Sequence, residues 1–305
     1  KYGFDRSLRA QYFLYINDVS PLSVHYNDHN AYTSLESGKY NFHQLFSVSD
    51  YTIVFKVPYL RESFVRNGKP VATILSDTLK NTFVLAVSSI IIALFLGLFL
   101  GVFSALYKDT FIDKLILFVS ALGMSLPSFF ASILIAWFFG FVLYEYTGLN
   151  MTGSLYEVDD YGRGLSLQIK NLILPAITLG IRPLSVIIQL VRSSLLEVFS
   201  MDYIRTAKAK GLSQFTILFK HALNNSLNPV VTAVSGWFAS LLAGAVFVEY
   251  IFAWNGIGKE IVDALNNLDL PVVMGAVLFI ASIFVFINIV VDIIYGILDP
   301  RIRIT

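Results

Sequence analysis

Two groups of residues have side chains that could bind a metal or a phosphate. His25 and His29 stand four positions apart with Asp28 between them, which is the spacing of two metal ligands on one face of a helix. Neither a third histidine nor the glutamate of a zinc motif accompanies them, so we expect the pair to be incidental. The string Gly256-Ile257-Gly258-Lys259 is not a phosphate-binding loop, because Glu260 stands where that loop needs Ser or Thr.

Other catalytic patterns are missing from the sequence as well. It has no Gly-x-Ser-x-Gly elbow and no His-Glu-x-x-His motif. We therefore expect a protein that is not an enzyme and that holds no cofactor or metal of its own. Any energy for its function must then come from another polypeptide.

A polar stretch at residues 202–212 lies between long apolar segments. Asp202 could cap a short helix there, and Gly211 could end that helix in the left-handed conformation. Ser213 could cap a second helix, whose three- and four-residue spacing puts apolar residues on one face: Phe215, Leu218, Phe219 and Ala222. Short helices are marginal in water, so we expect a docking element. The alternative is a basic loop that only sets membrane orientation.

Composition places the chain in a membrane. Of its 305 residues, 56% are hydrophobic and 14% are charged, too apolar a balance for an ordinary soluble domain. The net charge of +1 argues against a nucleic-acid binder, which needs clustered Lys and Arg. Without cysteine, the chain cannot form disulfides, thiolate zinc sites or a cysteine nucleophile.

Five apolar segments are long enough to cross a bilayer, and they predict an all-α integral membrane protein. They run from about Thr78 to Tyr107, Leu115 to Tyr144, Leu172 to Leu196, Ser226 to Tyr250 and Pro271 to Ile297. We expect residues 1–77 to form an extramembrane region, residues 78–300 the membrane core with the docking element at about 200–225, and residues 301–305 a cytoplasmic tail.

Several residues inside these spans are unusual for a membrane. Gly97 and Gly101 predict close helix packing, with helix bending as the alternative. Pro127 frees a backbone carbonyl, which indicates either a kink in a transport pathway or simple helix packing. An arginine near the centre of a membrane helix raises the free energy of insertion by about 3 kcal/mol. We therefore expect Arg182 to face protein or water, as a pathway residue would. Arg192 lies near the basic end of its span and is expected to snorkel.

The polar stretch resembles a known docking loop. Its form Tyr203-Ile204-Arg205-Thr206-Ala207-Lys208-Ala209-Lys210-Gly211-Leu212 is similar to the loop by which permease subunits of ABC importers grip their ATPases, in the dipeptide and oligopeptide permease family. The resemblance continues through His221, Ala222, Leu223, Asn225 and Pro229. It implies a docking role for Tyr203, Arg205, Thr206, Ala207, Lys208, Lys210, Gly211 and Leu212.

The resemblance covers nearly the whole chain. Residues 3–12 and 66–79 are similar to the segment that follows the first membrane helix of that family, so a sixth span is expected upstream of Lys1. Glu249, Phe252, Trp254 and Gly256 match a further family signature, in which Asn255 replaces the usual proline. The tail Asp299-Pro300-Arg301-Ile302-Arg303 is also similar. The implied fold is that of a type I ABC importer, with Glu249 as a further candidate pathway or gating residue.

Charge distribution predicts the orientation. One set of short loops and span ends holds nine basic residues: Lys108, Lys114, Arg192, Arg205, Lys208, Lys210, Lys220, Arg301 and Arg303. The opposing loops hold Arg163, Lys170 and Lys259. Because Lys and Arg mark the cytoplasmic side, we expect the docking element inside and residues 1–77 outside.

The resemblance implies one half of an ATP-driven peptide importer in the bacterial cytoplasmic (inner) membrane. Its implied partners are a homologous second permease subunit, two ATPase subunits that bind ATP and Mg, and an extracytoplasmic solute-binding protein. One alternative is a secondary transporter or channel driven by an ion gradient, for which Glu249, Asp292 and Arg182 are too scattered to form a relay. Others are a membrane-embedded hydrolase and an ABC importer of nickel or another small solute.

Overall fold

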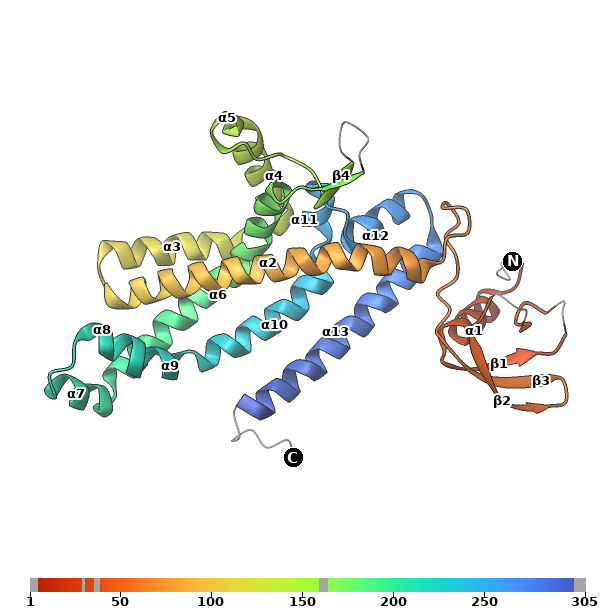
Figure 1. Cartoon of the computed structure of the whole chain (residues 1–305), viewed down its shortest axis with the longest axis horizontal. Helices are drawn as coiled ribbons and strands as arrows, with labels where there is room; N and C mark the ends of the chain where they lie inside the picture. Colours follow the sequence, from red (N-terminus) through yellow and green to blue (C-terminus); the bar gives the residue numbers. More distant parts are fainter. Residues whose placement is uncertain (1–4, 29–30, 36–38, 159–163, 299–305) are drawn as a thin grey trace. The chain divides into compact units, whose positions relative to one another are not determined.

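The computed structural model describes residues 5–28, 31–35, 39–158 and 164–298. The chain divides into two compact units. The first comprises Lys1–Ser76 with Ala264–Val277, and the second comprises Asp77–Asp263 with Leu278–Thr305. Figure 1 labels the helices and strands of both units.

The first unit begins with helix α1 and a small antiparallel sheet (Figure 1). Helix α1 (Leu8–Val19) precedes β1 (Leu22–Tyr26), β2 (Phe42–Val48) and β3 (Tyr51–Lys56), which pair in the order β1-β3-β2. The central strand β3 alternates between exposed and more buried positions, as a strand with one covered face does. The sheet adds strands to a chain that the sequence predicted to be all-helical, although the membrane part is helical as expected.

A buried carboxylate organises the interior of the first unit. The Asp18 carboxylate accepts hydrogen bonds from Tyr32 (2.6 Å), Tyr40 (2.8 Å) and Arg61 (2.9 Å). The ammonium group of Lys56 donates to the Asp18 carbonyl. Because these charged and polar groups are buried, their mutual hydrogen bonds offset the cost of removing them from water.

His25, the member of the histidine pair that the structure describes, does not lie on a helix. His25 lies in β1, where its Nδ1 contacts the Thr33 carbonyl at 2.8 Å and its Nε2 contacts the Ser23 hydroxyl at 2.8 Å. Both ring nitrogens are therefore engaged in the interior of the unit. His29 lies outside the described residues, and within the described part no cluster of three or more metal-binding side chains occurs.

The described residues of the second unit are helical apart from one short hairpin and the connecting loops. In chain order the elements are α2 (Val71–Leu106, which begins in the first unit), α3 (Phe111–Ser125), α4 (Ser128–Trp137), the π-helix η1 (Phe138–Val142), α5 (Tyr144–Thr147), β4 (Tyr156–Val158), β5 (Leu165–Leu167), α6 (Lys170–Ser200), α7 (Asp202–Ala209), α8 (Gln214–Thr216), the π-helix η2 (Ile217–Ala222), α9 (Leu223–Ser226), α10 (Asn228–Gly244), α11 (Val246–Ile251), α12 (Ile257–Asn266) and α13 (Leu270–Leu298, which also begins in the first unit).

Three described helices are long and apolar enough to cross a membrane: α2, α6 and the Leu270–Ile293 part of α13. They match three of the predicted spans. The predicted second span is not one helix, because α3 ends before Pro127 and the chain resumes as Ser128–Val142 at an angle of 111°. The predicted fourth span is divided among α9, α10 and α11, and α10 has only 17 residues.

Small residues bring the helices of the second unit close together. A Cβ atom on Gly97 would lie 2.6 Å from Cγ2 of Ile187, and one on Gly101 would lie 2.7 Å from Cβ of Val191. Such distances are shorter than any real contact, so only glycine allows α2 to approach α6 this closely. The packing prediction for these two glycines is confirmed.

Candidate functional site

The candidate docking element follows α6 directly and consists of α7 to α9 (Figure 1). Met201, in an extended conformation, separates α6 from α7 and occupies the N-cap position. Asp202 is the first helical residue instead of the predicted cap, and its carboxylate lies 3.4 Å from Nη1 of Arg205. The capping prediction for Asp202 is therefore wrong by one position, because α7 already begins at Asp202.

The turn between the two short helices is as predicted. Gly211 has a φ of +78° and nothing within 4 Å of where a Cβ would lie, so the left-handed conformation that ends α7 is free of strain only for glycine. Ser213 then caps α8 by accepting a hydrogen bond from the amide of Thr216 at 3.2 Å.

The second short helix does not present one apolar face. From Ile217 to Ala222 the chain is a π-helix, whose wider turn changes which residues share a face. Leu218 and Ala222 are buried, whereas Phe215 is 70% exposed and Phe219 is 49% exposed. The two exposed rings pack on each other with centroids 4.4 Å apart. The predicted single face is therefore split into a buried half and an exposed aromatic pair.

The predicted docking residues lie mostly on the exposed side of the element. Ile204 and Ala207 are buried in a cluster that also contains Leu195 of α6 and Ile217 of η2. The exposed residues of the predicted set are Tyr203, Arg205, Thr206, Lys208, Lys210, Gly211 and Leu212. Ala207 is the exception, since its buried side chain packs α7 against α6 and η2. The docking role itself stays a prediction.

An ion pair behind the docking element joins α6 to α3, and the sequence did not indicate it. Arg192 donates from Nε and Nη2 to the two carboxylate oxygens of Asp113, each at 2.8 Å. Asp113 also accepts from the Ser104 hydroxyl of α2 and from the Asp109 amide at 2.9 Å. The expectation that Arg192 snorkels is wrong, because a carboxylate 79 positions earlier in the chain is folded against it.

One local signal for Asp113 was available in the sequence. Thr110 is the N-cap of α3, and its hydroxyl accepts from the Asp113 amide at 3.4 Å, so Thr110 and Asp113 have the spacing of a capping box with an acid at the third position. That pattern predicts where α3 begins. It does not predict that the carboxylate turns toward Arg192.

The break at Pro127 lies beside Arg182. Nη2 of Arg182 donates to the Leu126 carbonyl at 3.4 Å. The carbonyl just before the break therefore gains a hydrogen-bond donor. Arg182 is exposed and lines a small cavity of about 80 Å³, together with Trp237 and Ser240 of α10. The pathway roles of Pro127 and Arg182 stay predictions.

Glu249 lies in the packed interior of the second unit. Its carboxylate accepts from the Thr82 hydroxyl at 2.7 Å and from the Gly258 amide at 2.6 Å, and its relative exposure is 0%. The carboxylate thus caps the start of α12 and fastens it to α2. Its predicted pathway or gating role stays a prediction.

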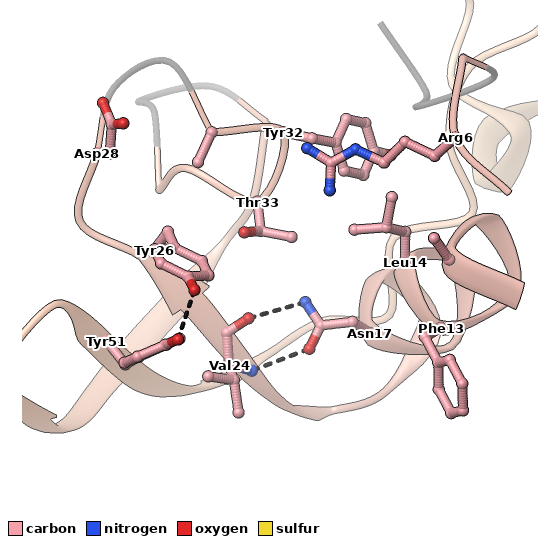
Figure 2. Close-up of a pocket in the computed structure, with 12 residues that line it drawn as sticks. Arg6, Phe13, Leu14, Asn17, Val24, Tyr26, Asp28, Tyr32, Thr33 and Tyr51 are labelled. Atoms are coloured by element: carbon pink, nitrogen blue, oxygen red, sulfur yellow. Dashed lines mark hydrogen bonds between the residues drawn. The ribbon is translucent and has the colours of Figure 1, made fainter.

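The first unit contains a larger groove of about 670 Å³ between α1 and the sheet. Figure 2 shows two hydrogen-bonded pairs among the residues that line it. The Asn17 amide donates to the Val24 carbonyl at 3.0 Å and accepts from the Val24 amide at 2.9 Å, and the hydroxyls of Tyr26 and Tyr51 are hydrogen bonded.

The long apolar helices define a helical membrane protein, in which an exposed basic element follows directly at the end of α6. A family model described as "Binding-protein-dependent transport system inner membrane component" matches residues 97–304. The chain belongs to this family.

Relatives and solved structures agree with this assignment. The dipeptide transport system permease protein DppB of Haemophilus influenzae is 41% identical over 258 residues, covering 78% of this chain and 75% of that protein. The protein of the same name from Alkalihalophilus pseudofirmus is 37% identical over 252 residues, covering 78% and 76%. An inward-facing structure of the MetNI methionine ABC transporter has a TM-score of 0.58 at 15% identity, covering 75% of this chain and 97% of that one, which shows a shared fold.

Proposed function

We propose that this chain is the membrane-spanning subunit of an ATP-driven importer of di- or oligopeptides. The observation that carries the proposal is the docking element, whose exposed side is basic and whose buried side is packed onto α6. The sequence lacks a phosphate-binding loop, so the nucleotide belongs to partner ATPases. The names of the relatives favour peptides over nickel or another solute.

The proposal includes further partners and an orientation. A homologous second permease subunit completes the pathway, two ATPase subunits that bind ATP and Mg contact the docking element, and a solute-binding protein delivers cargo from outside. The family description as an inner membrane component supports a place in the bacterial inner membrane. The distribution of Lys and Arg favours a cytoplasmic docking element.

The test is uptake of a labelled dipeptide by proteoliposomes that contain the complete transporter. We expect uptake that requires ATP on the side of the docking element and a cargo-loaded binding protein. Gly211→Glu should abolish association with the ATPases. Gly164→Glu is the matched control, because Gly164 also has a positive φ (+117°) and open space around it. Uptake driven by an ion gradient without ATP would favour a secondary transporter.

A further inference from the structure

Helix α3 is fastened to α6 at both of its ends. At the start of α3, the Asp113 carboxylate receives two hydrogen bonds from Arg192. At the other end, Arg182 donates to the carbonyl of Leu126, the residue that follows α3. Two arginines of one helix, ten positions apart, therefore hold the two ends of its neighbour.

The two helices are also in close contact between these ends. The Ser120 hydroxyl donates to the Ser185 carbonyl at 3.3 Å. A Cβ on Gly123 would lie 2.8 Å from Cγ2 of Ile181, so the backbones approach closely there. Helix pairs held by polar ties and close backbone contact move as one body, because packed interiors resist continuous deformation.

The α3–α6 pair continues into the docking element on one side and ends at a break on the other. Helix α6 leads through Met201 into α7, whose Ile204 is fully buried against it. After Leu126 and Pro127, both in extended conformation, the chain turns into α4. Pro127 has no amide hydrogen, so the regular helical hydrogen bonding is interrupted at this point.

We propose that Asp113, Arg192 and Arg182 are positioning residues that make α3 and α6 a single rigid element, and that the chain bends at Leu126–Pro127 when the docking element moves. This inference rests on the proposed function. Displacement of α7 then carries α3 with it, and α4 changes its angle to α3. The bidentate geometry of the Arg192–Asp113 pair suits this role, because it fixes orientation as well as distance.

The first experiment measures distances in the assembled, otherwise unchanged transporter. The chain has no cysteine, so pairs of spin labels can be introduced into it without background from its own side chains. One pair, on Leu115 and Asp202, reports on α3 relative to the docking element, and the other, on Val119 and Ile133, spans the break. These four side chains are exposed. We expect the first distance to stay within the width of its distribution between the nucleotide-free and vanadate-trapped states, and the second to change. A change in the first distance as large as that in the second would overturn the proposal.

The second experiment measures peptide taken up per ATP hydrolysed in assembled complexes. We expect Asp113→Asn and Arg192→Gln to hydrolyse ATP but to transport roughly 2- to 30-fold less peptide per ATP. The double variant Asp113→Arg/Arg192→Asp should recover part of this loss. The control is Lys259→Gln, which breaks the Lys259–Asp263 ion pair (2.6 Å) on α12 and should leave the ratio unchanged.

Two results would refute the coupling role. One is an unchanged ratio in assembled Asp113→Asn and Arg192→Gln complexes. The other is equal loss of ATP hydrolysis and uptake in every variant, which would indicate a purely structural ion pair. Failure of the proposed function is a different result, since the unchanged chain would then show no ATP-dependent uptake at all.

Discussion

The Glu249 carboxylate accepts a hydrogen bond from the Thr82 hydroxyl at 2.7 Å, across 167 positions of the chain. The same Thr82 oxygen accepts from the Ile257 amide at 2.9 Å. One hydroxyl therefore joins α2 to both sides of the turn that precedes α12. This arrangement is buried, so each of its polar groups depends on the others for a partner.

Replacement of Thr82 should lower the stability of the folded protein. Thr82→Val keeps the shape of the side chain but leaves the Ile257 amide and one Glu249 oxygen without their partner. Each buried group left in this way costs about 1–3 kcal/mol, so we expect a clearly lowered melting temperature in detergent. Ser282→Ala is the control, because the Ser282 hydroxyl bonds only to the Leu278 carbonyl of its own helix. Equal melting temperatures for the two variants would contradict the assignment.

The turn beside Glu249 has no room for a side chain at Gly256. A Cβ there would lie 2.4 Å from the Glu249 carboxylate, so Gly256→Ala must displace a buried, hydrogen-bonded group. We expect a loss of stability of several kcal/mol, in line with a disrupted buried network, measured by thermal unfolding. Gly236→Ala, in α10 with nothing within 4 Å, should be neutral or slightly stabilising because alanine favours helix.

The aromatic pair on the docking element should contribute to binding of the ATPase partner and not to the stability of the fold. Phe215 and Phe219 are exposed and contact each other, and exposed aromatic side chains are frequent anchors of protein interfaces. We expect Phe215→Ser to weaken binding of the ATPase partner by about 1–2 kcal/mol, roughly a 5- to 30-fold rise in Kd, with an unchanged melting temperature. Phe46→Ser, at a 54% exposed position of β2, is the control. An unaltered affinity for the ATPase partner in Phe215→Ser would show that the aromatic pair does not contribute to docking.

Stability of the first unit should depend on pH through Lys56. Burial lowers the pKa of Lys56 from its ordinary 10.5 to about 8, so between about pH 8 and 10 the unfolded chain holds a proton that the folded chain has lost. The free energy of unfolding therefore rises with pH in this range, by roughly 1–3 kcal/mol in total.

The measurement is thermal unfolding followed by near-ultraviolet circular dichroism of the tyrosines. Burial and Asp18 raise the pKa of Tyr32 and Tyr40, which reverses the slope above about pH 10 because the folded state then keeps protons that the unfolded state loses. Lys56→Met should flatten the rise between pH 8 and 10. A rise of the same size in that variant would assign it to another group.

Much of the membrane architecture could be predicted from the sequence, because it depends on local properties. The length of an apolar run sets whether it can span a bilayer, and α2, α6 and α13 follow those runs. Gly211 and Ser213 were predictable for the same reason, since a left-handed turn and a helix cap involve neighbouring residues. The docking sequence itself was sufficient to indicate the family.

Only the tertiary structure decided how those helices are joined. The partner of Arg192 is Asp113, 79 positions away, and the partner of Glu249 is Thr82, 167 positions away. No local pattern links such residues, because their contact arises when packed helices bring distant positions together. The division of the Phe215–Ala222 face likewise depended on the π-helix, a backbone geometry that periodicity alone does not reveal.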